Sequence, residues 1–280
     1  MQAEVNTKEL IYLYAFIPTQ EYEENKLTDI EGIDPDYNIE YYVFDEVTAV
    51  ACLVKHEDFA EEVLQKKVED MKWLQEKAYH HHERMNTLHN TYTVIPLKFG
   101  TIYEDKSRLE ETLAEHKENI HTVFHKLSSK EEWNIKIFTD KEAFIKEVKE
   151  NSPEVTKKVQ EIEGLSKGKQ FFEKKKLKDF IEKQADKEID KYCESIHEKL
   201  ETFSADKEVK KNWERKLTGR DDDMCWNGAY LFPKDKVEQV LQFISEEKDK
   251  AEKEGSSFKF EITGPWPAYH FSNFQTQGGE

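Results

Sequence analysis

The chain has 280 residues and a formal net charge of −17, from 59 Asp plus Glu against 42 Lys plus Arg. This length suggests one large or two ordinary domains. So acidic a chain repels nucleic-acid phosphate and anionic lipid, so we expect neither nucleic acid nor membrane as a main ligand. No apolar stretch approaches the roughly 20 residues that a membrane-spanning helix needs. The 17 Phe, 12 Tyr and 5 Trp favour a folded core over disorder.

The cysteines and the N-terminal residues indicate a reducing compartment. Cys52, Cys193 and Cys225 are too few and too scattered for a disulfide framework or a zinc knuckle. Glu4 and Glu9 precede the first apolar run, where a secretory signal would have basic residues. We therefore expect three reduced thiols in a cytoplasmic protein.

The first half of the chain is typical of a small sheet with helices. β-Branched and aromatic runs that stop at turn residues predict strands, and apolar residues that recur every three or four positions predict a helix. Two of the runs are separated by Asp45-Glu46 and resemble a hairpin. The expected strands are 10–17, 39–44, 47–54 and 94–97, and the expected helix is 59–78.

The second half is dominated by helical periodicity. Ser107 with Glu110, and Thr139 with Glu142, have the spacing of a capping box, and Ser152-Pro153 is typical of a helix start. The longest unbroken helical pattern has a narrow apolar stripe, as in a helical hairpin or short coiled coil. The expected helices are 107–127, 139–148, 153–163, 168–203 and 237–254, and the expected strands are 133–138, 224–232 and 258–262.

This order of elements predicts an α+β protein with two domains. The first is an α+β domain at residues 1–103. The second, at 104–274, suits a ferredoxin-like βαββαβ sheet that carries an enlarged helical arm at about 140–203. Residues 275–280 are expected to form a flexible tail.

Charge is distributed unevenly between the two halves. Residues 1–60 contain 14 Asp plus Glu against 3 Lys, a net charge of −11, whereas residues 167–191 contain 9 Lys against 6 acids. Such asymmetry can steer head-to-tail association between copies. The alternative is that these are ordinary solvated helix faces.

Three short motifs resemble binding sites for phosphate or metal ions, but each also has a purely structural interpretation. Gly164–Gln170 superficially resembles a phosphate loop, but it has three residues between its glycines and Gln where the hydroxyl residue belongs. Asp221-Asp222-Asp223 could hold a divalent ion, but it lacks the spacing of a calcium loop and favours a solvated turn. The histidines at 80–82 with Glu83 and His89 could bind a metal, but lack the i, i+4 spacing and favour a polar helix end.

The C-terminal segment 263–271, Thr-Gly-Pro-Trp-Pro-Ala-Tyr-His-Phe, places three large rings on a stiff backbone. Pro265 and Pro267 are expected to prevent regular structure there. The segment is either a clamp that seals a sheet edge or a contact patch for a partner, and the clamp is favoured because aromatic residues are usually buried.

That segment and Val94–Thr101 resemble the gas vesicle protein GvpL/GvpF family. The motifs Pro-Leu-x-Phe-Gly-Thr and Thr-Gly-Pro-Trp-Pro-x-Tyr are specific, and weaker matches in family order extend from about Leu10 to Phe271. The chain departs from the family at Ala15, where Gly is frequent, at Lys98, where Arg is frequent, and in the block 168–172. The candidate structural or partner-contact residues are Pro96, Phe99, Gly100, Thr101, Trp133, Tyr230, Gly264, Pro265, Trp266, Pro267 and Tyr269.

The resemblance implies a non-enzymatic accessory or minor structural protein of the gas vesicle, without a cofactor. Such a protein would bind the small hydrophobic shell protein GvpA or other accessory proteins during assembly, in the cytoplasm or on the vesicle. Its partner surface would lie on the N-terminal sheet or on the helical arm. The alternative is a metal-dependent enzyme using His80, His82, Glu83 and His89, and a third possibility is a scaffold that self-associates through the arm.

Overall fold

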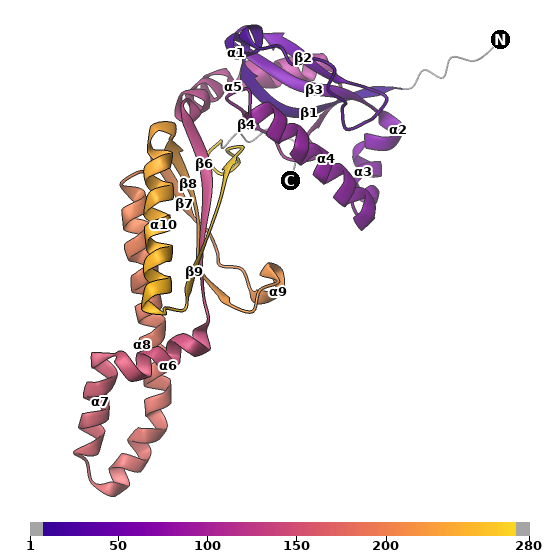
Figure 1. Cartoon of the computed structure of the whole chain (residues 1–280). Coiled ribbons are helices and arrows are strands. Elements are labelled where there is room, and N and C mark those ends of the chain that lie inside the picture. The colour runs from indigo at the N-terminus through magenta and orange to yellow at the C-terminus, as the bar shows by residue number, and fades with distance from the viewer. Residues whose placement is uncertain (1–7, 273–280) are drawn as a thin grey trace, which may run out of the picture. The chain divides into compact units, whose positions relative to one another are not determined.

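The computed structural model describes residues 8–272, which form two compact units (Figure 1). Of these residues, unit 1 comprises 8–132 and 265–272, and unit 2 comprises 133–264. The mixed helix-and-sheet class is confirmed. The division differs from the predicted boundary at residue 103, because the helix that follows packs on the strands of the first sheet. The predicted tail, 275–280, lies outside the described residues.

Unit 1 contains a five-stranded sheet with the order β2-β3-β1-β4, in which β5 also pairs with β1. The predicted hairpin is present, and its turn places Asp45 at a φ of 58°. Strand β2 is at one edge of the sheet. The strands are β1 (Glu9–Pro18), β2 (Ile39–Phe44), β3 (Val47–Lys55), β4 (Ile95–Pro96) and β5 (Ile102–Tyr103).

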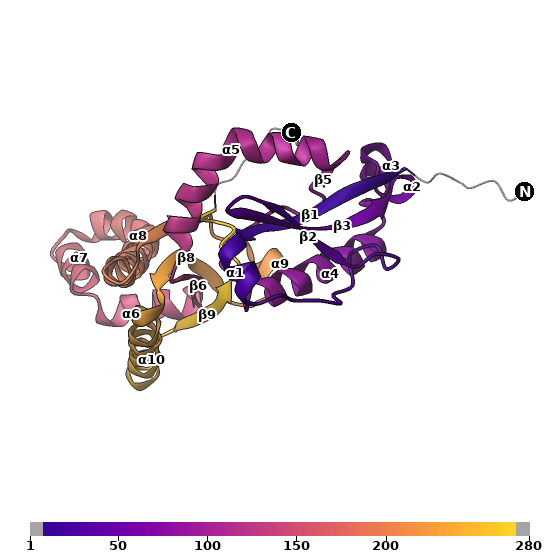
Figure 2. The same ribbon diagram turned by 90° about the horizontal axis from the view of Figure 1, so that it is seen from above.

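Both faces of this sheet are covered, since α4 (Met71–His89) and α5 (Lys106–Leu127) lie on opposite sides of it (Figure 2). Strand β1 is consequently buried on both faces, which explains why its sequence is continuously apolar instead of alternating. Its pairing with β3 shifts register between Leu13 and Ala15. The other helices of the unit are the short α1 (Thr19–Glu24), α2 (His56–Phe59) and α3 (Glu61–Lys67).

The single helix predicted at 59–78 is wrong in its bounds. The helical pattern is interrupted after α3, and Asp70 starts α4 by accepting hydrogen bonds from the backbone N–H groups of Lys72 and Trp73. Helix α4 then continues to His89, so the histidine run occupies the middle of a helix and not its end.

Unit 2 contains a four-stranded sheet with the order β7-β8-β6-β9. Along the chain the strands and helices follow as strand, three helices, strand, strand, helix, strand, apart from two short turns of helix. The strands are β6 (Lys130–Thr139), β7 (Asp206–Val209), β8 (Asp223–Pro233) and β9 (Phe258–Trp266). Strand β9 continues through Pro265, contrary to the prediction, because an edge strand tolerates a residue without an N–H.

Helices α8 and α10 pack on one face of the second sheet, and their apolar residues meet Ile135, Ile137, Tyr230 and Phe232 in the core (Figure 1). Helices α6 and α7 pack against α8, and we call these three helices the arm. These helices are α6 (Lys141–Asn151), α7 (Pro153–Glu163), α8 (Lys167–Glu201), α9 (Arg215–Thr218), η1 (Lys234–Lys236) and α10 (Val237–Glu254). Within residues 8–272, none of the helices has the length and apolarity to span a bilayer.

Candidate functional site

His81 lies at the centre of an aromatic cluster in unit 1. Its side chain is 4% exposed, although the sequence predicts a polar, partly exposed helix end. Tyr14 stacks on the imidazole, with ring centroids 5.5 Å apart and 14° between the planes. Phe99 meets the imidazole edge-on at 5.9 Å. Offset and edge-to-face contacts of this kind are the favoured ones between rings.

The hydrogen bonds of the cluster fix the tautomer of His81. The Tyr12 hydroxyl accepts a hydrogen bond from the Gly100 backbone N–H at 3.2 Å and lies 2.8 Å from His81 Nδ1. We infer that this hydroxyl donates a hydrogen bond to Nδ1, so that the proton of the neutral imidazole is on Nε2. Nε2 lies 3.3 Å from the Tyr269 hydroxyl. One neutral histidine thus joins β1, α4 and the C-terminal segment.

Burial also keeps the cluster neutral. It lowers the pKa of His81 to about 4, because a buried imidazolium loses its hydration. It raises the pKa of the Tyr12 and Tyr14 phenols well above their ordinary value. At neutral pH these three groups are therefore uncharged, and their hydrogen bonds hold the segments of the unit together.

The Pro-Leu-Lys-Phe-Gly-Thr stretch, residues 96–101, runs along β1 and into this cluster. Leu97 N–H donates to Tyr14 C=O and Leu13 N–H donates to Thr101 C=O, both at 2.9 Å. Gly100 has a φ of +83°, a conformation that residues with a side chain rarely adopt. The glycine thus lets its N–H reach Tyr12, which accounts for the motif in physical terms.

The Thr-Gly-Pro-Trp-Pro-Ala-Tyr stretch, residues 263–269, reaches the same helix from the other end of the chain. The Trp266 ring lies 5.7 Å from that of His82, and Tyr269 lies against His81. Gly264 has a φ of +148°, which again favours glycine. Pro265 is exposed, whereas Pro267 is buried.

A buried carboxylate fixes the end of this segment. Glu132 is 1% exposed and accepts a hydrogen bond from the His270 backbone N–H at 3.1 Å. Its other oxygen lies 2.6 Å from His270 Nδ1. The motif at 96–101 and residues 265–269 of the second motif are therefore joined within unit 1. Sequence reasoning named Tyr269 as a candidate, but it did not single out Tyr12 or Glu132.

The sequence profile described as "Gas vesicle synthesis protein GvpL/GvpF" matches residues 10–273, which include both motifs. The chain belongs to the GvpL/GvpF family. This family comprises structural or accessory proteins of the gas vesicle and is not known for enzymatic activity. The resemblance seen in the sequence is thus confirmed.

Similar proteins agree with this membership. Gas vesicle protein L of Streptomyces sp. (strain CB03234) is 23% identical over 227 residues, which are 81% of this chain and 80% of that protein. The crystal structure of GvpF from Anabaena sp. PCC7120 superposes with a TM-score of 0.69 at 16% identity, covering 96% of this chain and all of that one. GvpF from Microcystis aeruginosa gives a TM-score of 0.60 at 16% identity, with coverage of 95% and 99%. At these identities the two crystal structures show that the fold is shared.

The remaining GvpL/GvpF-motif candidates lie in unit 2. Trp133 is half-buried and packs on the core of that unit. Tyr230 is fully buried and stacks on Phe232 with ring centroids 5.6 Å apart. Its hydroxyl accepts a hydrogen bond from Trp226 Nε1 at 3.1 Å and lies 2.8 Å from His197 Nδ1. A tyrosine–histidine pair thus fastens α8 to the sheet in unit 2 as well.

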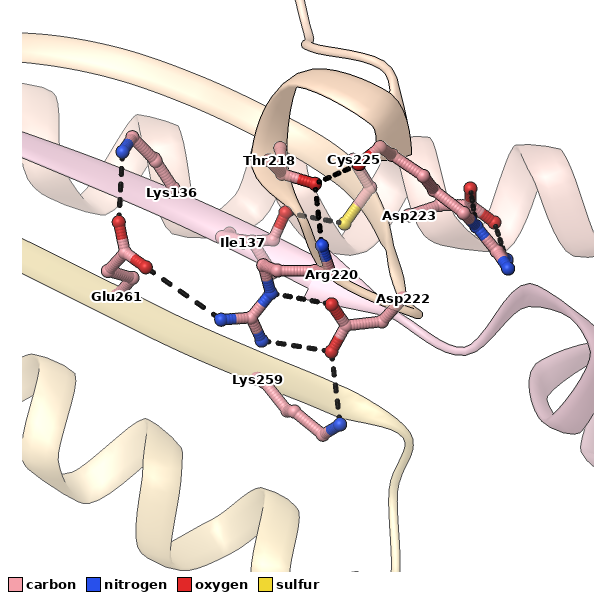
Figure 3. A network of polar contacts seen from close by, with 10 residues as sticks. Lys136, Ile137, Thr218, Arg220, Asp222, Asp223, Cys225, Lys259 and Glu261 are labelled. Atoms are coloured by element: carbon pink, nitrogen blue, oxygen red, sulfur yellow. Dashed lines mark hydrogen bonds and ion pairs between the residues drawn. The ribbon is translucent and has the colours of Figure 1, made fainter.

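In the acidic run at 221–223, Asp221 is exposed as the predicted solvated turn requires, but Asp222 is buried (Figure 3). Asp222 is 5% exposed and makes a bidentate ion pair with Arg220, at 2.6 and 2.9 Å, and a hydrogen bond with Lys259 at 3.0 Å. These cations lower the pKa of Asp222 to about 2, chiefly through the hydrogen bond from Arg220. The Arg220 guanidinium also lies 4.0 Å from the centre of the Phe138 ring. The carboxylate is therefore occupied by protein cations.

The alternative of a metal-dependent enzyme is not supported. Across residues 8–272 there is no group of three or more His, Cys, Asp or Glu side chains arranged to hold a metal ion. His81 bonds to tyrosines instead, and His82 Nε2 lies 3.1 Å from Asn86 Nδ2. Glu83 is exposed to solvent.

The lowered pKa of His81 predicts that unit 1 loses stability in acid. Below the ordinary imidazole pKa of 6.5, the unfolded state binds a proton that the folded state excludes down to about pH 4. The free energy of opening should therefore fall by up to about 1.4 kcal/mol per pH unit in that window, or about 2 kcal/mol between pH 7 and 5. Hydrogen exchange of the β1 amides measures this loss. In a His81→Phe variant this part of the loss should vanish, and an equal loss in the variant would refute the assignment.

Proposed function

We propose that this chain is a non-enzymatic accessory or minor structural protein of the gas vesicle, which binds the shell protein GvpA or other accessory proteins during assembly. The observation that carries the proposal is the match to the GvpL/GvpF family over residues 10–273. We place its action in the cytoplasm during assembly and at the vesicle. The C-terminal segment 265–272 then acts as a clamp that completes unit 1, and does not itself contact the partner.

The open edge of β2 is the partner surface that we favour on unit 1. Val43 is 49% exposed on this edge strand. An edge strand presents backbone N–H and C=O groups that can pair with an extended segment of another protein. A small, apolar shell protein would gain both these hydrogen bonds and apolar contact.

The charge of the chain supports the same role. A net charge of −17 favours solubility of the protein. A complex with an apolar partner would share that charge, and so stay in solution until the partner is delivered.

Co-purification of the chain with GvpA tests this proposal. We expect complex formation with the native protein and a loss of at least about tenfold in affinity, equivalent to about 1.4 kcal/mol, for Val43→Lys. Lysine on an edge strand discourages pairing without changing the core. The matched control is Leu217→Lys, a residue of unit 2 whose side chain is 75% exposed and which is not part of the sheet that contains β2. Equal binding by the native chain and both variants would exclude the β2 edge, and no association of GvpA or accessory proteins with the native chain would contradict the function.

Two structural assignments belong with this proposal. We take units 1 and 2 as the two domains of the protein. We also class unit 2 as a ferredoxin-like sheet with an enlarged helical arm, supported by its strand order β7-β8-β6-β9 and its βαββαβ element order.

A further inference from the structure

The end of the helical arm exposes two neighbouring aromatic rings. We define the arm tip as residues 164–178, where α7 ends and α8 begins (Figure 1). Phe171 and Phe172 are 60% and 66% exposed, and their ring centroids are 5.8 Å apart. Leu165 on the turn is also exposed. These residues form an apolar patch at the point of the arm farthest from the sheet of unit 2.

The arm does not need these rings for its own packing. The buried residues of α8 begin at Ile181, and those of α7 are Val155 and Ile162. Covering a phenylalanine side chain that is otherwise exposed contributes roughly 1.5–3 kcal/mol. Two exposed rings side by side are therefore typical of the centre of a protein–protein interface, and not of a solvent-exposed helix surface.

The arm tip is positively charged, whereas a segment of unit 1 is negatively charged. Residues 164–178 contain six Lys and one Glu, a net charge of +5. Lys175 Nζ lies 5.0 Å from the centre of the Phe171 ring, so charge and aromatic surface coincide. Residues 21–36, which we call the acidic segment, contain seven Asp plus Glu and one Lys, a net charge of −6. Its exposed members are Glu23, Glu24, Asp29 and Glu31, in addition to Asp36, which pairs with Lys55.

We propose that the arm tip of one copy docks on the acidic segment of unit 1 in a second copy. The occupant is argued from charge complementarity, because opposite charges on two parts of one chain steer identical copies into head-to-tail contact. Such a contact is heterologous, so each pair of copies keeps one free tip and one free acidic segment, and the association propagates into short chains or a ring. An anionic lipid surface is the competing occupant, and it is distinguished from a second copy by vesicle binding in the absence of self-association. The proposal does not depend on the gas vesicle role.

Sedimentation velocity of the full chain over a range of concentrations tests this docking. At an ionic strength of about 0.01 M, where charges act over about 30 Å, we expect the average mass to rise with concentration. At about 1 M the charges act over about 3 Å, and the association should weaken at least tenfold. A monomer at all concentrations in low salt would overturn the proposal.

Charge exchange between two variants identifies the surfaces. Lys174→Glu/Lys175→Glu lowers the net charge of the tip from +5 to +1, and Glu23→Lys/Glu24→Lys reduces the net charge of the acidic segment from −6 to −2. Each variant alone should stay monomeric, whereas an equimolar mixture should associate again, because the native tip of one variant then meets the native acidic segment of the other. A mixture that stays monomeric would refute the pairing of these two surfaces.

Removal of the rings separates the apolar part from the charge. Phe171→Ser/Phe172→Ser should weaken self-association at least tenfold with the lysines in place. Matched controls in unit 2 are Leu217→Ser and Lys211→Glu/Lys216→Glu, which alter equally exposed side chains away from the tip and should associate like the native chain. Circular dichroism checks that α8 remains helical. Undiminished association of the serine variant, or binding of the native chain to phosphatidylserine vesicles without self-association, would contradict the proposal.

Discussion

Replacing Tyr230 by Ala is expected to lower the free energy of unfolding of unit 2 by about 3–5 kcal/mol, the range for truncating a large buried aromatic side chain. Tyr230 is fully buried on β8 and packs between Phe232 and the histidine of α8. A Cβ on Gly228 would come within 2.6 Å of its ring, so the glycine is part of the same packing. The lost ring would leave a cavity between the sheet and the helix that also supports the arm.

Hydrogen exchange of the β8 and α8 amides measures this effect unit by unit, since each 1.4 kcal/mol corresponds to about tenfold faster exchange of globally protected amides. Tyr230→Phe separates packing from hydrogen bonding. It retains the ring but removes the partner of Trp226 Nε1 and His197 Nδ1, which should cost about 1–3 kcal/mol. Leu217→Ala, on the surface of the same unit, should stay within about 0.5 kcal/mol of the native chain. A Tyr230→Ala variant with native exchange rates would show that this pair does not secure α8.

Replacing Glu132 by Ala is expected to release the C-terminal clamp of unit 1. The substitution removes the acceptor of two hydrogen bonds, to the backbone N–H and the imidazole of His270. Hydrogen bonds to a charged group contribute about 1.5–3 kcal/mol each. We expect the bond from the imidazole to contribute the lower value, because that side chain is partly exposed. The backbone amides of 269–272 should exchange at least about tenfold faster. Because Tyr269 contacts His81 on α4, the backbone amide of His81 should also exchange faster.

Two further variants make this prediction specific. Glu132→Gln retains an oxygen acceptor for the His270 N–H and should recover part of the protection. Glu110→Ala changes an exposed acid on α5 and should have no effect on residues 269–272. Native exchange of these residues in Glu132→Ala would show that the clamp is held by its aromatic contacts alone.

The elements predicted from apolar patterning are largely those observed, whereas their ends depend on hydrogen bonds that the patterns do not reveal. The capping boxes at Ser107 and Thr139 are wrong, because Asp105 and Asp140 accept the hydrogen bonds from the first-turn N–H groups instead. Strand β7 was missed because its sequence, Asp-Lys-Glu-Val, has no apolar alternation. Backbone pairing with β8 holds this segment as a strand, because its residues have little intrinsic preference for the strand conformation.

The central side chains of the candidate site were beyond the reach of sequence patterns. His81 is one of three consecutive histidines, and helical geometry alone does not show which one faces the sheet. Its partners Tyr12 and Tyr269 are 69 and 188 residues away, so only the fold brings them together. The resemblance to the GvpL/GvpF family did locate both motifs. Part of the reason is physical, because each motif contains a glycine, at position 100 or 264, with a backbone conformation that other residues rarely adopt.

The most direct measurement of the central claim is buoyancy of a gas-vesicle-forming host from which this chain has been deleted. If the protein acts by contacting vesicle components, the cells should lose flotation and vesicles visible by electron microscopy. The native gene should restore both, the Leu217→Lys control should do the same, and Val43→Lys should restore them poorly. Normal flotation in cells that lack the chain would contradict the account.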